Sequence, residues 1–198
     1  MAVVFGVILA GGRSRRFGSE KAAASLGGAT LLERAHARLS TLCQSVAVSA
    51  PETSRAATLA QALGAPVLAD PRGAPPGPLS GVLSALHWAA AGRAELLVTA
   101  PCDAPLLPDD LAARLVEGLG SAPAAVARTS EGLQPLCAVW RTGLARALGE
   151  ILQDGRHPAV KQVLADAGAA EVLFPDAGAF ANVNTPQDLE AAAARLGA

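Results

Sequence analysis

The amino-acid sequence predicts an α/β fold, a Rossmann-like three-layer α/β/α domain built on a mostly parallel sheet. The first observation is that apolar, strand-like runs alternate with helix-like segments along the chain. Such alternation is typical of parallel strands that are joined by crossover helices and covered on both faces. The second is that the first apolar run, Val3–Leu9, opens directly into a loop rich in glycine and arginine. A strand that ends in such a loop is a common way for α/β proteins to hold nucleotides.

The elements expected in the first half of the chain follow this alternation. After the first loop they are a helix over Leu31–Leu42, a strand over Ser45–Ser49, a helix over Thr53–Leu63, a strand over Ala65–Ala69 and a helix over Leu79–Ala91. Apolar residues at helical spacing indicate the first helix, and Gly64 ends the second. The short third strand leads to Asp70, which precedes a stiff loop over Pro71–Pro78.

The second half continues the pattern. It is expected to contain a strand over Ala94–Ala100, a helix over Asp109–Leu119, strands over Ala124–Arg128 and Gln134–Trp140, helices over Leu144–Leu152 and Pro158–Ala167, a strand over Glu171–Phe174 and a last helix that ends at Leu196. The first of these strands is the most strongly apolar and leads to Asp103. Thr185 and Pro186 suit the N-cap and the first position of the last helix.

Length and composition narrow the class of protein. A chain of 198 residues, 51% of them hydrophobic, fits a single domain over residues 1–198 with a substantial core. A net charge of −1 and a scarcity of aromatic residues argue against nucleic-acid and membrane-surface binding. No signal-peptide pattern and no membrane-length apolar run is found. Three widely spaced cysteines fit a reducing compartment, so we expect a cytoplasmic protein.

The loop after the first strand carries the strongest motif. It reads Leu9-Ala10-Gly11-Gly12-Arg13-Ser14-Arg15-Arg16-Phe17-Gly18-Ser19-Glu20-Lys21. Because Gly11 and Gly12 have no Cβ, their backbone N–H groups can approach a phosphate, and Arg16 and Lys21 add positive charge. A Walker A loop is excluded because Ser-Glu follows the third glycine, and the adjacent glycines break the G-x-G-x-x-G dinucleotide fingerprint.

Polar side chains follow three later strands at their carboxyl ends. Ser49 ends its predicted strand, Asp70 directly follows the next one, and Asp103 lies three residues beyond the strand over Ala94–Ala100. Ligands of parallel sheets bind beyond these ends, so we expect the three residues to meet the glycine-rich loop at one site. Mg²⁺ takes one or two protein carboxylates and fills its other positions with phosphate oxygens and water, which suits Asp103. Both aspartates are also consistent with a purely local role in turns.

Three further segments support one family. They are Pro101-Cys102-Asp103-Ala104-Pro105, Gly77-Pro78-Leu79-Ser80-Gly81 and Phe180-Ala181-Asn182-Val183-Asn184-Thr185-Pro186. Together with the glycine-rich loop, they resemble the motifs of the molybdenum cofactor guanylyltransferases, in the same order. The resemblance runs from Leu9 to Leu189 and implies that the α/β domain has the nucleotidyltransferase fold. The chain departs from the family at Glu20, where Asp is usual, and at Ser49, where Asn is frequent.

The resemblance also implies a set of ligands. GTP would contact Leu9, Ala10, Gly11, Gly12, Lys21, Asp70 and Asp103; Arg16, Lys21 and Asp103 would serve catalysis; Asp103 would hold Mg²⁺; and Asn182 and Asn184 would bind molybdopterin. The two asparagines alternate on an extended segment, so their side chains are expected on the same side. The alternative interpretation is that they tie down the last helix. Gly81 would let the helix approach the base or the ribose of the nucleotide. Close packing of the helix on the sheet explains this glycine equally well.

The implied reaction is attack by the terminal phosphate of molybdenum-molybdopterin on the α-phosphorus of GTP, with release of pyrophosphate. The nucleophile is already an anion, so positioning and charge stabilisation would dominate. One alternative is a cytidylyltransferase acting on the same cofactor, whose members typically show L-A-A-G in place of Leu9-Ala10-Gly11-Gly12. Others are a sugar-1-phosphate nucleotidyltransferase and a non-catalytic nucleotide carrier. Molybdoenzyme clients or their chaperones would be further partners.

Overall fold

A seven-stranded sheet forms the centre of the molecule in a computed structural model, which describes residues 2–11, 21–153 and 155–197. The strands lie in the order β5-β4-β1-β6-β8-β7-β9. Their bounds are β1 Val4–Leu9, β4 Ser45–Ser49, β5 Val67–Leu68, β6 Leu96–Pro101, β7 Ala124–Thr129, β8 Gly132–Arg141 and β9 Ala170–Leu173. Strand β8 pairs antiparallel with both neighbours, and the other pairings in this sheet are parallel, so the predicted mostly parallel sheet is confirmed.

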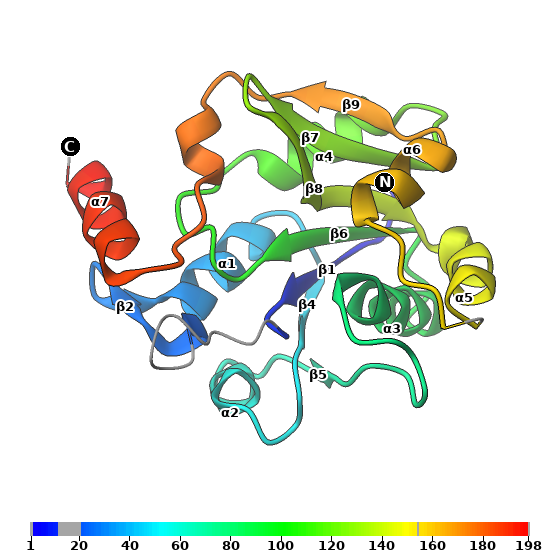
Figure 1. Cartoon of the computed structure of the whole chain (residues 1–198), viewed down its shortest axis with the longest axis horizontal. Coiled ribbons are helices and arrows are strands. Elements are labelled where there is room, and N and C mark those ends of the chain that lie inside the picture. Colours follow the sequence, from blue (N-terminus) through cyan, green and yellow to red (C-terminus); the bar gives the residue numbers. More distant parts are fainter. Residues whose placement is uncertain (1, 12–20, 154, 198) are drawn as a thin grey trace.

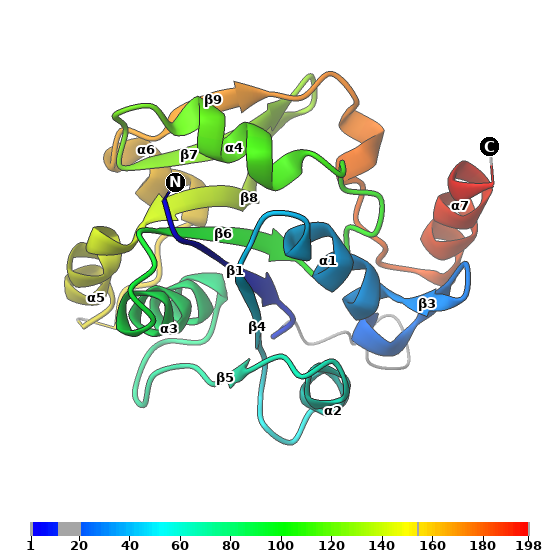
Figure 2. The same cartoon turned by 180° about the vertical axis from the view of Figure 1, so that it is seen from behind.

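Helices cover both faces of the sheet and complete the three layers. Their bounds are α1 Leu31–Ser40, α2 Arg55–Ala62, α3 Pro78–Ala91, α4 Leu111–Leu119, α5 Ala145–Gln153, α6 Val160–Asp166 and α7 Pro186–Leu196. Helices α3, α5 and α6 pack on the face that is nearer in Figure 1. Helices α1 and α4 pack on the opposite face, which Figure 2 brings to the front. Among the described residues, no helix combines the length and the apolar character that a membrane crossing needs.

Strand β1 shows why the sequence produces two cores. Successive side chains of a strand point to opposite faces, so a strand covered on both sides reads as a continuous apolar run. Val4 and Ile8 belong to the core beneath α1 and α4, and Val7 belongs to the core beneath α3, α5 and α6. All three are buried. Strand β1 lies between β4 and β6, so its carboxyl end is flanked by the ends of two parallel strands.

A small hairpin between β1 and α1 was not predicted. Strands β2 (Ser25–Leu26) and β3 (Ala29–Thr30) pair antiparallel across Gly27 and Gly28, which have φ angles of 57° and 83°. Hairpin turns of two residues need such positive φ values, and glycine adopts them at little cost. Strands of two residues are too short to produce a hydrophobic period, so the adjacent glycines are the one local signal for this turn.

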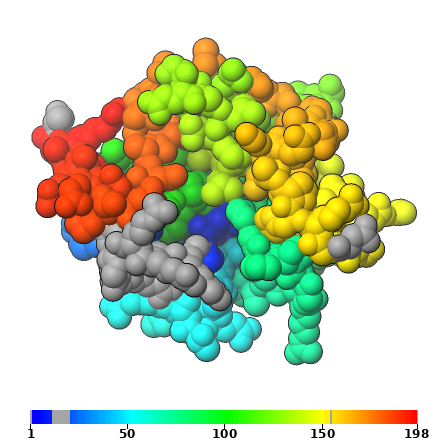
Figure 3. All heavy atoms as spheres, in the orientation of Figure 1, coloured from blue at the N-terminus to red at the C-terminus, as the bar shows by residue number. Residues whose placement is uncertain are grey.

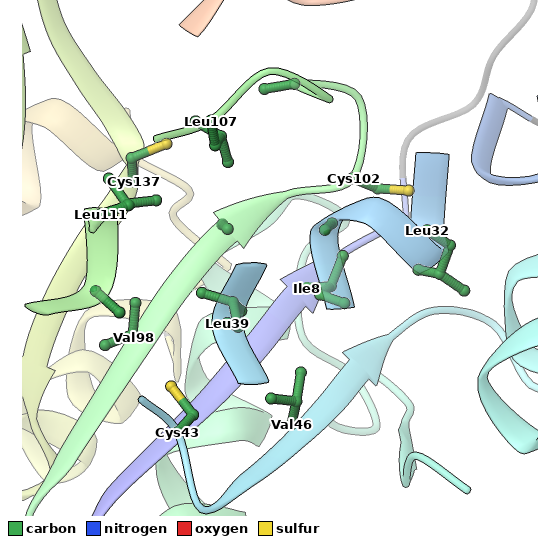
Figure 4. Close-up of a cluster of buried hydrophobic side chains, with 14 of the residues drawn as sticks. Ile8, Leu32, Leu39, Cys43, Val46, Val98, Cys102, Leu107, Leu111 and Cys137 are labelled. Carbon is green, nitrogen blue, oxygen red and sulfur yellow. The ribbon is translucent and has the colours of Figure 1, made fainter. Parts of the chain in front are cut away.

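All three cysteines are buried in the core beneath α1 and α4. Figure 4 shows Cys43 beside Leu39 and Val46, and Cys137 close to Leu111. Burial raises the pKa of the Cys43 thiol to about 12 and raises the pKa of Cys137 as well. The reactive thiolate is therefore nearly absent from both at neutral pH.

We expect that an aromatic disulfide, which labels thiols by thiol–disulfide exchange, leaves Cys43 and Cys137 unmodified in the native protein at about pH 8. Both thiols should react once the chain is unfolded in urea, because their pKa values then return to about 8.5. Peptide mass spectrometry before and after unfolding identifies the labelled residue. Rapid labelling of either thiol in the native protein would contradict the packing of this core.

Candidate active site

A cleft of about 310 Å³ opens at the carboxyl edge of the parallel strands. Its walls come from the ends of β1, β4 and β6, from the segment after β5, and from the start of α3. The lining residues are Leu9, Ala10, Gly11, Lys21, Ala22, Ser49, Asp70, Pro76, Gly77, Pro78, Gly81, Pro101, Cys102, Asp103 and Leu136. In Figure 3 the dark blue atoms at the end of β1 are recessed near the centre of the face. The expected meeting of strand ends at one site is thus present.

The end of β1 is tied to the strands on both sides. The backbone N–H of Ala10 donates to the carbonyl of Ser49 at 2.9 Å, and the N–H of Cys102 donates to the carbonyl of Leu9 at 3.2 Å. A Cβ added at Gly11 would meet no atom of the described residues within 4 Å. The predictions for Gly12 and Arg16 lie outside the described residues. This geometry leaves a fixed platform of backbone at the base of the cleft.

Lys21 and Asp103 both line the cleft and contact each other there. Lys21 begins a 3-10 helix over Lys21–Ala23, and Asp103 lies two residues beyond β6. The Nζ atom of Lys21 donates to Oδ2 of Asp103 at 3.1 Å. The side chains are 17% and 28% exposed, respectively, so most of each charged side chain is shielded from solvent. The pair thus holds a cation and a carboxylate together within the cleft.

Asn184 joins this pair from the far end of the sequence. Its Oδ1 atom accepts a hydrogen bond of 2.5 Å from Nζ of Lys21. The neighbouring backbone N–H of Val183 donates to the carbonyl of Asp103 at 2.7 Å. The segment before α7 therefore runs along the turn that carries Asp103. Asn182 is exposed, and its side chain forms no hydrogen bond with the other described residues.

The wall opposite Lys21 is formed by the proline-rich loop and the start of α3. Two serine hydroxyls of α3 fix the chain around Asp70: Ser84 donates to the carbonyl of Ala69 at 2.7 Å, and Ser80 donates to the carbonyl of Pro75 at 2.6 Å. Desolvation raises the pKa of Asp70, and the charge of His157 opposes that rise. Asp70 is exposed at the cleft, so its carboxylate can accept hydrogen bonds from a ligand.

His157 packs against Gly77, a contact that no local signal in the sequence indicates. A Cβ built on Gly77 would lie 2.3 Å from Nε2 of His157, and the φ angle of Gly77 is 150°, which side chains rarely adopt. Nε2 is buried without a hydrogen-bond partner among the described residues. Gly77 thus lets the imidazole approach the backbone of the cleft wall.

Gly81 brings α3 close to the strand ends. A Cβ added at Gly81 would lie 2.4 Å from Oγ of Ser49 and 3.3 Å from Cδ2 of Leu9. The helix therefore approaches β4 and β1 more closely than a larger residue would allow. Ser49 itself is only 5% exposed, so its side chain has little room to move aside. The contact supports the packing interpretation of Gly81.

We expect Gly81→Ala to lower the free energy of unfolding by about 1–3 kcal/mol, the usual cost of overpacking. Gly149 in α5 provides the matched control, because a Cβ there would meet nothing closer than Leu83 at 4.0 Å. Gly149→Ala should instead gain up to about 1 kcal/mol of helix propensity. Urea unfolding of both variants measures the two effects. A Gly81→Ala protein as stable as the original would show that α3 is not held against Ser49.

The donor set at Asp103 fits a magnesium ion that arrives with a nucleotide. Among the described residues, no group of three or more His, Cys, Asp or Glu side chains could hold a metal ion alone. Mg²⁺ prefers one or two carboxylates and completes its shell with phosphate oxygens and water. The carboxylate of Asp103 lines the cleft beside Lys21, which is compatible with that kind of shared coordination.

Comparison with known proteins matches residues 6–171 to the model of the MobA-like NTP transferase domain. The chain belongs to the MobA-like NTP transferase family. It is 43% identical over 195 residues to the molybdenum cofactor guanylyltransferase of Cereibacter sphaeroides, covering 98% of this chain and 97% of that protein. It is also 43% identical over 192 residues to the protein of the same name from Acidiphilium cryptum, covering 95% and 93%. The resemblance found in the motifs is confirmed.

Solved structures of MobA-like proteins and of other nucleotidyltransferases share the fold. The molybdopterin-guanine dinucleotide biosynthesis protein A of Archaeoglobus fulgidus superposes with a TM-score of 0.74 at 22% identity, covering 98% of each chain. CMP:2-keto-3-deoxy-manno-octonic acid synthetase in complex with CTP superposes with a TM-score of 0.76 at 14% identity, covering 99% of each chain. At these identities the superpositions establish the nucleotidyltransferase fold and leave the substrate open.

Proposed function

We propose that this protein transfers GMP from GTP to molybdenum-molybdopterin, which yields the guanine dinucleotide form of the molybdenum cofactor and pyrophosphate. The observation that carries this function is the 43% identity, over nearly the full length of both chains, to proteins named molybdenum cofactor guanylyltransferase. The cleft supports it because Lys21 and Asp103 are both present and paired there. A non-catalytic carrier would have no need to keep both groups together.

The nucleotide would lie over the platform formed by Leu9, Ala10 and Gly11, with Gly12 completing the loop. On the far wall, Asp70 is suited to the base, because guanine presents N1–H and N2–H₂ donors on its Watson–Crick edge. The carboxylate of Asp70 is exposed at the cleft and has two oxygens that can accept such a pair of donors. We propose that Asp70 contributes to the preference for guanine.

The triphosphate would extend toward Lys21 and Asp103. Lys21 is a compact point charge suited to stabilise the crowded α-phosphorus and the departing pyrophosphate, and we propose that Arg16 assists it. We propose that Asp103 binds Mg²⁺, which when bound supplies further positive charge to the phosphate oxygens. The attacking phosphate is already an anion, so this reaction needs no strong general base. Positioning and charge stabilisation would account for most of the rate.

The acceptor would enter beside the segment that precedes α7. Asn182 is exposed there, two residues before Asn184, which accepts from Lys21. The side-chain amide of Asn182 can both donate and accept hydrogen bonds. The edge of a pterin is a row of donors and acceptors, which such an amide matches. We propose Asn182 as an acceptor contact, and Asn184 stays close enough to touch the acceptor and Lys21 together.

Calorimetric titration with GTP, CTP, ATP and UTP, with and without Mg²⁺, tests the nucleotide half of this function. We expect GTP to bind most tightly and its affinity to increase when Mg²⁺ is present. A preference for CTP would transfer the assignment to a cytidylyltransferase. No binding of any nucleotide would contradict an enzymatic role and favour a carrier.

A further inference from the structure

The ammonium group of Lys21 is held by two different kinds of acceptor. Nζ donates to the carboxylate of Asp103 at 3.1 Å and to the amide oxygen of Asn184 at 2.5 Å. An ammonium has three hydrogens, so these two contacts direct the third, and within the described residues no further acceptor takes it. Lys21 and Asn184 are 163 positions apart in sequence, so the contact exists only in the folded chain.

Asn184 is itself fixed from both sides along the backbone. Its N–H donates to Oδ2 of Asp188 at 2.8 Å, and the same carboxylate forms the capping box of α7 with Thr185. On the other side, the N–H of Val183 donates to the carbonyl of Asp103, and the Val183 side chain is only 2% exposed. The pKa of Asp188 is lowered mainly by the hydrogen bond from the N–H of Asn184, and the positive charge of Lys21 lowers it further. The amide oxygen is therefore presented to Lys21 from a rigid segment.

We propose that Asn184 is a positioning residue for Lys21, so that the segment before α7 sets nucleotide affinity and does not serve the acceptor alone. Asp103 is less suited to hold Lys21 in place during the reaction, because its negative charge offsets the positive charge of the ammonium group. Its carboxylate is also the group suited to a metal ion. The amide of Asn184 is neutral, so it holds the ammonium without cancelling its charge. This role rests on the transferase reaction proposed above, since it assigns Lys21 to the nucleotide phosphates.

The contact can be tested by nucleotide titration without any acceptor present. We expect Asn184→Ala to weaken GTP binding about tenfold, the usual effect of removing a hydrogen bond to a charged group. Gln187→Ala is the matched control: this exposed side-chain amide near the start of α7 has no described hydrogen-bond partner, so the substitution should keep GTP affinity within about twofold. Thermal unfolding of each variant verifies the fold. Unchanged GTP affinity in Asn184→Ala would overturn the proposal and leave Asn184 to the acceptor.

A double-mutant cycle separates positioning from direct contact with the nucleotide. In a Lys21→Met background, Asn184→Ala should weaken binding by no more than about twofold further, because the group it positions is gone. A full tenfold effect in both backgrounds would overturn the proposal, since Asn184 would then act independently of Lys21. Millimolar nucleotide concentrations keep the weakened variants measurable.

The cycle is also informative if the base preference differs from the one proposed. Should the unsubstituted protein prefer CTP, the same variants are titrated with CTP, because a lysine that contacts phosphates serves any triphosphate. The guanylyltransferase assignment then fails while the positioning role is still measured. Absence of binding to all four triphosphates would overturn both.

Discussion

Asp103→Asn is expected to reduce the rate of nucleotidyl transfer about 1,000-fold, the upper range for losing one electrostatic group at a reacting centre. The substitution removes the negative charge that suits Mg²⁺ and keeps the size of the side chain. The backbone carbonyl of Asp103 still accepts from Val183, and an asparagine oxygen can still accept from Lys21. We therefore expect the fold to be retained, with an unfolding free energy within about 1 kcal/mol of the original.

Turnover with GTP, Mg²⁺ and molybdenum-molybdopterin measures this effect as release of pyrophosphate. Asp166→Asn, at an exposed position in α6, is the matched control and should leave the rate unchanged. Titration of the Asp103→Asn protein with GTP should also lose its dependence on Mg²⁺. A variant that keeps more than about a tenth of the rate would remove Asp103 from the proposed reaction.

Lys21→Met is expected to lower kcat/KM about 100-fold, since a hydrogen bond between charged groups contributes up to about 3 kcal/mol. The methionine keeps the length of the side chain and loses the ammonium that faces Asp103 and Asn184. Lys21→Arg should recover only part of the loss, because a planar guanidinium cannot reproduce the contacts of a compact ammonium.

The chain offers an unusually clear control for this substitution, because Lys161 is its only other lysine. Lys161 is exposed in α6, so Lys161→Met should leave kcat/KM unchanged. Steady-state kinetics of the three variants provide the comparison. Equal kinetics for Lys21→Met and the unsubstituted protein would show that the ammonium group of Lys21 does not contribute to the transfer reaction.

The meeting of the strand ends at the cleft was predictable, because it follows from the alternation of strands with helices and from the burial of the strands. The strands that lead to Ser49, Asp70 and Asp103 are parallel, so their carboxyl ends meet at the cleft. The reversed direction of β8 depends instead on a short turn, since only antiparallel strands can be joined by so few residues. A hydrophobic pattern alone does not reveal this direction.

Contacts between distant parts of the chain were not predictable. The sequence motif indicated Asn184 as a polar group near the cleft, but its bond to Lys21 depends on where α7 begins and on how its cap holds the backbone. The approach of His157 to Gly77 likewise depends on how the segment before α6 meets the segment before α3. A single sequence contains local preferences and carries no record of such pairings.

One competition experiment tests the proposed reaction most directly. The protein is incubated with molybdenum-molybdopterin, Mg²⁺ and equal concentrations of GTP and CTP, and the dinucleotide product is identified by mass spectrometry. The guanylyltransferase assignment predicts the guanine dinucleotide as the dominant product, with one pyrophosphate released for each product formed and no product from Asp103→Asn. A cytosine dinucleotide as the dominant product, or no dinucleotide at all, would contradict it.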